Sequence, residues 1–172
     1  MVNRTSWTAG LGQGLTFGAL FAGADINASD SAAGLGNGHV VLSSQGDITN
    51  NSSFDMFMDI SYRFTIASST IAVGANIAFF LYYKNQDNTA YGDNQLTAGT
   101  ANTTYSAAIQ PCATVGIPAL AATTNFYGTA TGIIIAPGIF RVAMQNNSGF
   151  AFSSTLGSQA VQYRTYNMNL NA

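Results

Sequence analysis

Between Phe54 and Ile66 apolar and polar residues alternate, with Phe57 as the one apolar residue among the polar positions. Successive side chains of a β-strand point to opposite faces, so this alternation predicts a strand with one buried and one solvated face. A helix would scatter the same apolar residues around its circumference. The predicted solvated face carries Asp55, Asp59 and Arg63.

A second strand is predicted from Ile71 to Tyr83, where apolar residues run almost without interruption. Continuous apolar runs of this length are typical of strands that are buried on both faces. Only a short polar stretch, Ser68 to Thr70, follows the first strand. The sequence therefore predicts that the two strands form a hairpin.

Further strands are predicted in the C-terminal third, at 129–135, 139–145, 150–153 and 160–170, with turns at Ala136-Pro137-Gly138 and at Asn146 to Gly149. Pro111 and Pro118 bracket a segment that we expect to be irregular or to form a sheet edge, because proline has no N–H to donate. Short strands between turn-forming residues, without an amphipathic helix, indicate an all-β sandwich or barrel.

The first part of the chain is rich in glycine and alanine. Glycine disfavours helix and permits close approach of another backbone, so we expect an extended arm that lies along a neighbouring molecule. We predict a single domain, in which residues 1–50 form the arm and the first strands and residues 51–172 form the sandwich. The arm residues that we expect at an interface are Trp7, Leu11, Phe17 and Phe21.

Charged residues make up only 7% of the chain, whereas hydrophobic residues make up 47%. About one-quarter of the residues in an ordinary soluble domain are charged. Asn, Ser, Thr, Gln and Gly replace the charges here, and they hydrogen-bond without the desolvation cost of an ion. With eleven Phe and eight Tyr the chain has too much apolar surface to be disordered. We therefore expect neighbouring molecules to cover much of its exterior.

Two classes of partner are disfavoured. The net charge is −2 and no basic residues cluster, which argues against nucleic-acid binding. The first residues lack the basic and apolar pattern of a signal peptide, and the longest apolar run is interrupted by Gly74 and Asn76. We therefore expect neither secretion nor a membrane span.

The inventory of reactive side chains is small. Cys112 is the only cysteine, which excludes an intrachain disulfide, and we expect it to be a buried apolar thiol. His39 is the only histidine and lies in a predicted turn, and one His with one Cys cannot complete a zinc shell. Asp and Asn residues between Asp87 and Asn94 offer oxygen ligands for calcium, but solvated turn residues are the favoured interpretation. We predict no enzymatic activity, no catalytic residue, no cofactor and no metal.

Tyr91 and Tyr105 lie in polar segments that read as loops. Tyrosine combines an apolar ring with a polar tip, so it suits sugar stacking and protein interfaces alike. We favour the interface and add both residues to the predicted contact set.

The C-terminal third carries an ordered series of strand and turn motifs. Ile133 to Ala151 runs from a strand through Pro137-Gly138 into a second strand and then Asn146 to Gly149, and Tyr163-Arg164-Thr165-Tyr166 follows. This order resembles a family of small jelly-roll capsid decoration proteins, or cement proteins, of tailed bacteriophages, and the likeness covers residues 53–167. Family members often carry more charge in their middle loops than this chain has from Gln95 to Tyr105.

The resemblance implies a jelly roll of two antiparallel sheets. It also implies a homotrimer on the outer surface of the virion capsid, at three-fold and quasi-three-fold positions, where it clamps adjacent major capsid proteins. Two alternatives stay open. One is another phage structural module, such as a tail, spike or fibre base that binds glycans. The other is a glycan hydrolase or lyase, for which only aspartate pairs such as Asp55 and Asp59 would be available.

Overall fold

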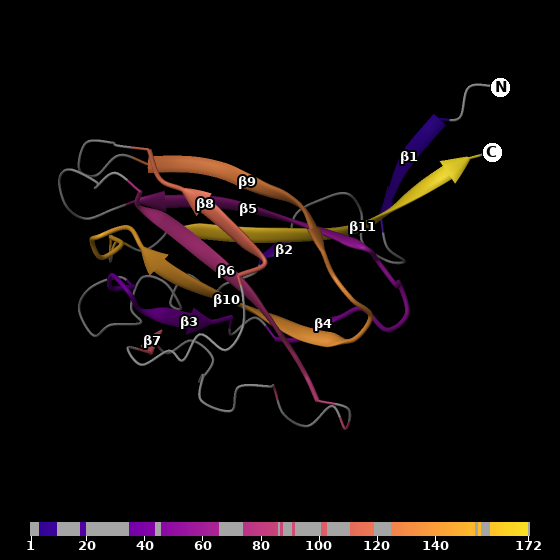
Figure 1. The fold of residues 1–172 in the computed structure, drawn as a ribbon, viewed down its shortest axis with the longest axis horizontal. Helices are drawn as coiled ribbons and strands as arrows, with labels where there is room; N and C mark the ends of the chain where they lie inside the picture. Colours follow the sequence, from indigo (N-terminus) through magenta and orange to yellow (C-terminus); the bar gives the residue numbers. More distant parts are fainter. Residues whose placement is uncertain are drawn as a thin grey trace.

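The computed structural model describes residues 4–9, 18–19, 35–43, 46–65, 74–85, 87, 91, 101–102, 111–118, 125–153, 155 and 159–171. Within these residues every regular element is a β-strand, and the strands form two antiparallel sheets (Figure 1). The prediction of an all-β protein is thereby confirmed. None of the described segments is a helix that is long and apolar enough to cross a membrane.

The first sheet has the strand order β1-β11-β5-β9, and β2 also pairs with β11. Its strands are β1 (Arg4–Ala9), β2 (Gly18–Ala19), β5 (Phe57–Thr65), β9 (Asn125–Ile134) and β11 (Ala160–Asn171). Only the first half of β11 pairs with β5, from Ala160 to Tyr166. The second half pairs with β1, so these two strands leave the body of the molecule as a ribbon (Figure 1).

The second sheet has the order β7-β3-β10-β6-β8, and β4 also pairs with β10. Its strands are β3 (Val40–Leu42), β4 (Ile48–Thr49), β6 (Asn76–Tyr83), β7 (Ala101–Asn102), β8 (Ala113–Gly116) and β10 (Ile139–Asn147). The segment between the two prolines, β8, is an edge strand. This agrees with the sequence prediction for it.

The predicted hairpin between the first two long strands is wrong. β5 pairs with β11 and β9, whereas β6 pairs with β10 and β8, so the two strands lie in different sheets. The physical reason is the core: Met58, Ile60 and Phe64 of β5 share one buried cluster with Ile77 and Phe79 of β6, in the opposite sheet. Apolar faces that point at each other from opposite sheets bury more surface than neighbours in one sheet.

The core between the sheets is largely aromatic. Phe64 stacks on Phe152 with 4.8 Å between ring centroids, and Tyr62 contacts Phe79 of the other sheet at 6.4 Å. Phe126 of β9 packs against both Tyr62 and Phe64. Such ring pairs add about 0.5–1.5 kcal/mol each beyond the area they bury. Among these pairs, the one between Tyr62 and Phe79 joins the two sheets.

The second sheet is also buried on its other face. A second cluster of buried apolar residues covers that face: Val40, Leu42, Ala78, Phe80, Tyr82 and Ala143. Since alternate residues of β6 belong to the two clusters, the prediction that this strand is buried on both faces is confirmed. The predicted start at Ile71 lies outside the described residues.

Candidate interaction surfaces

Two of the six predicted interface residues fall in described parts of the chain. Trp7 lies in β1, in register with Met168 of β11. Tyr91 forms an isolated bridge with Lys84 at the end of β6. The other four predicted contacts, Leu11, Phe17, Phe21 and Tyr105, lie outside the described residues.

Tyr91 belongs to a charged cluster at the surface of the second sheet. Its hydroxyl donates to the carboxylate of Asp47, which also binds Lys84 Nζ at 2.6 Å and Arg141 Nε at 2.8 Å. Both cations lie over the Tyr91 ring, at 5.5 and 5.2 Å from its centroid. The cluster ties three segments of the chain together, and its contacts are within the chain.

The ionisation of this cluster is shifted by its geometry. Burial alone would raise the pKa of Asp47, but hydrogen bonds from Lys84, Tyr91 and Arg141, with the charge of Arg141, lower that pKa to about 2. Burial and the hydrogen bond to Asp47 raise the pKa of Tyr91 to about 12. The ion pair is therefore fully formed at neutral pH.

The loop before β5 is organised by the side chain of Asn50. Asn50 Nδ2 donates to the carbonyl of Asp55 at 2.8 Å and to that of Ala136 at 3.1 Å. Its Oδ1 accepts from the Asp55 N–H at 2.7 Å and from Ser53 Oγ at 3.0 Å. All of the amide's main hydrogen-bonding positions are therefore used to fix one loop conformation.

Phe54 is at the tip of this loop in an unusual conformation. Its φ is +49°, and no other non-glycine residue in the described part of the chain has positive φ. A bulky residue in the left-handed region is strained by roughly 1–2 kcal/mol. The strain does not bury the ring, because the side chain is 58% exposed. Backbone strain that the surrounding structure enforces is concentrated at functional sites.

Two more large apolar side chains are exposed close to Phe54. Met56 is 56% exposed and Ile134 is 77% exposed. Their backbone segments are neighbours, because Ile135 N donates to the Met56 carbonyl at 3.1 Å and Ile134 is in register with Phe57. We call Phe54, Met56 and Ile134 the end patch. The sequence pattern placed Phe54 and Met56 on the buried face of the strand, and that prediction is wrong because the strand begins only at Phe57.

The predicted solvated face of β5 needs a second correction. Asp55 and Asp59 are only 1% and 2% exposed. Asp59 Oδ2 binds Arg164 at 2.8 Å, while Oδ1 accepts from Tyr166 Oη at 2.8 Å and from Gly132 N at 2.9 Å. A buried carboxylate is tolerated only with such partners. Asp59 therefore fixes the bulge of β9 opposite Met58 and Ile60 and does not form a solvated rim.

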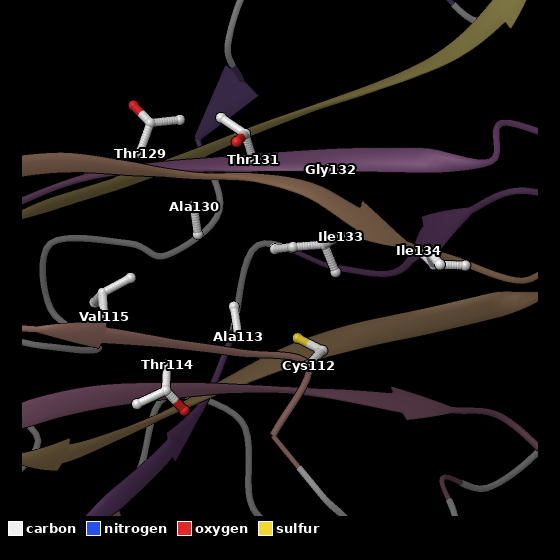
Figure 2. A pocket seen from close by; sticks show the side chains of 10 residues that line it. All are labelled: Cys112, Ala113, Thr114, Val115, Thr129, Ala130, Thr131, Gly132, Ile133 and Ile134. Atoms are coloured by element: carbon white, nitrogen blue, oxygen red, sulfur yellow. The ribbon is translucent and has the colours of Figure 1, made fainter.

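A groove of about 600 Å³ separates the edge strands β8 and β9. Figure 2 shows Ala130 pointing from β9 toward β8, and Ala113 and Val115 pointing from β8 toward β9. These small side chains leave space between the edges of the two sheets. Thr129 and Thr131 are exposed on the other face of β9. The groove carries no charged residue among those that line it.

Chemistry at these surfaces is limited. The described residues contain no group of three or more His, Cys, Asp or Glu that could hold a metal ion. Cys112 lines the groove, but its Sγ donates to the Phe79 carbonyl at 3.2 Å and burial raises its pKa to about 12. A thiol with this pKa is a poor nucleophile at neutral pH.

Comparisons with known proteins add no relative. No protein-family model matches the chain, and no curated protein and no solved structure matches it either.

Sequence reasoning missed the end patch and the groove. The available signal for the patch was the motif Asn50-Asn51-Ser52-Ser53, a run of turn formers that can bond their own backbone and so precede a tight loop. Nothing in the sequence indicated the groove, because β8 and β9 become neighbours only when the two sheets pack.

Proposed function

We propose that this chain is a structural virion protein that assembles as a homotrimer on the outer surface of a capsid and cements adjacent major capsid proteins. The observation that carries the proposal is the end patch. Three large apolar side chains are exposed at one end of a chain with only 7% charged residues. Large apolar side chains left exposed at one end of a molecule favour a protein interaction site there.

The loop geometry supports an interaction role for the patch. Asn50 holds Phe54 in a strained conformation that exposes its ring, although a smaller residue would fit the same backbone better. The base of the ribbon is anchored to this loop, since Asn167 Oδ1 accepts from Met56 N at 2.8 Å. Patch and ribbon are thus parts of one end of the molecule.

A capsid clamp stabilises the shell through the surface area that each copy buries and through the number of copies. Packaged DNA pushes capsid proteins apart, and a trimer that bridges them adds buried surface across every seam. Apolar burial contributes about 25 cal/mol per Å², and many weak contacts made at once give high avidity. Few charges are then needed, since most of the contact surface is hidden from water.

Imaging purified virus particles tests the proposal. We expect this chain to form three-fold protrusions on the head and the purified protein to be a trimer that binds undecorated capsids. Phe54→Ser with Ile134→Ser should abolish capsid binding, while Thr49→Ser, a change at an exposed β4 residue, should leave it intact. Binding to glycans or host cells but not to capsids would contradict the proposal.

A further inference from the structure

Among the described strands, the first sheet has β1 at one edge and β9 at the other. Its order, β1-β11-β5-β9, leaves the outer side of β1 and the outer side of β9 without a partner strand in the described part of the chain. Unpaired backbone N–H and C=O groups at a strand edge form a template for another strand. Natural monomers protect such edges with charge, proline or very short strands.

The β9 edge lacks charge and proline, and its one protection of this kind is the bulge at Thr131 and Gly132. The strand is 10 residues long, and between Asn125 and Ile134 it contains no charged residue and no proline. It borders the groove with β8, which is also an edge strand within the residues that the structure describes. A groove of about 600 Å³, lined by uncharged side chains, gives an incoming strand space for side chains on that side.

The β1 edge is complementary to it. β1 is the outer strand of the two-stranded ribbon, and Arg4 is its only charged residue. Two strands alone are marginally stable in water, so the ribbon gains from a third strand. It cannot pair with its own β9, because β11 and β5 lie between them in the sheet.

We propose that β1 of one copy of this chain pairs with the β9 edge of a second copy, beside the β8–β9 groove, so that the first sheet continues from subunit to subunit. This inference rests on the proposed self-assembly and names the surfaces that carry it. The main-chain hydrogen bonds of the added strand provide affinity, as in other cases of strand addition.

The contact is heterologous, because it joins two different surfaces, β1 and β9. Contacts of this kind close into rings when the rotation between subunits allows it. A ring of three is the closed form that agrees with the proposed trimer. A two-fold contact through a single edge would instead join β9 to β9 or β1 to β1.

Site-directed cross-linking tests this contact. In a Cys112→Ala background, which removes the one native thiol, Thr131→Cys is combined with Thr8→Cys and the protein is treated with a short bis-maleimide. We expect covalent multimers from the double variant and none from Thr131→Cys or Thr8→Cys alone. Multimers from Thr131→Cys alone would show that β9 pairs with β9 and would overturn the proposal.

A lysine introduced at the β9 edge gives a second test of the strand contact. Thr131→Lys should weaken self-association about tenfold or more, because lysine on a strand edge opposes strand addition. Thr155→Lys makes the same change at an exposed loop residue outside the groove and should have no effect. Thermal unfolding of dilute protein checks that both variants fold.

The two proposals fail differently. If the protein remains a trimer that binds capsids but neither cross-linking nor Thr131→Lys has the expected effect, the strand contact is wrong and the proposed function stands. If the unmodified protein is a monomer at all concentrations, both are wrong.

Discussion

At the scale of a single residue, Phe54 combines a strained backbone, which lowers stability, with an exposed aromatic ring. Its φ of +49° is held by the Asn50 hydrogen bonds, and the ring that results is solvent-exposed. A protein selected for monomer stability alone would place Gly or Asn at this position. The strain is consistent with a ring that is retained for contact with another molecule.

Replacing Phe54 by Asn should therefore separate folding from assembly. We expect the free energy of unfolding to be unchanged or raised by up to about 1 kcal/mol, because Asn tolerates positive φ. Self-association and capsid binding should be weakened. Met56→Asn is the control, since it removes an equally exposed apolar side chain from an unstrained position and should give no gain in stability. Urea unfolding and sedimentation measure the two effects; a destabilised Phe54→Asn would contradict the role of strain.

Gly128 is required for a different reason. A Cβ at this position would overlap the ring of Tyr62, its register partner across β5 and β9. The ring also packs on Phe64 and Phe79 in the core, so it cannot move freely. The ring of Tyr62 thus occupies the space that a side chain at position 128 would need.

Gly128→Ala should lower the free energy of unfolding by about 1–3 kcal/mol, as overpacking of a core does. Gly116→Ala, in edge strand β8, is the matched control, because a Cβ there meets nothing within 4 Å and its φ is not positive. Chemical denaturation of both variants checks this. Equal losses in the two variants would rule out the clash with Tyr62 as the cause.

At the scale of elements, the Asp47 cluster ties β4, β6 and β10 together. Asp47 precedes β4, Lys84 follows β6, and Arg141 lies within β10. Tyr91 joins them from the connection that follows β6. Exposed ion pairs are usually weak, but a shared carboxylate with two cations and a hydroxyl is a network.

The pH dependence of stability should reveal this network. The pKa of Asp47 is about 2 in the folded chain, whereas the ordinary value for an aspartate is 3.8. The stabilisation is therefore present above about pH 4 and is lost as the pH falls toward 2. Because the side chain is 25% exposed, solvent screening should limit the effect to about 1 kcal/mol. We expect Asp47→Asn to lose this amount at neutral pH and only a small part of it near pH 2, by urea unfolding. Asp87→Asn, a loop carboxylate, should show no such difference.

The strands also show which parts of the secondary structure the sequence pattern predicts correctly. The predicted strand at 139–145 corresponds to β10, and the one at 160–170 to β11, each within two residues at either end. The predicted turn residue Asn146 is instead completely buried, and its Nδ2 donates to the carbonyls of Leu35 and Phe150, each at 2.8 Å. A buried asparagine that bonds backbone carbonyls of a loop has the same local sequence as an asparagine in a solvated turn. Only the packed structure distinguishes the two cases.

At the scale of the whole molecule, the low charge content predicts how assembly responds to salt. The oligomeric mass should not change between about 0.05 and 1 M NaCl, because screening acts on charge pairs and few exist. Sulfate should strengthen assembly, since it favours burial of apolar surface. Light scattering after size exclusion measures both, with a protein joined by ion pairs as the control. Dissociation in NaCl would contradict an apolar interface.

The sequence alone determined the class of the fold and the low charge content of the surface. Period-two alternation and continuous apolar runs specify strands because side-chain direction along a strand is a local property, and composition fixes how little charge any arrangement can expose. The tertiary structure decided which strands share a sheet, which aspartates are buried, and which edges and apolar side chains remain open. Those features depend on contacts between residues far apart in the chain, as between Asp59 and Arg164, and no local pattern encodes them.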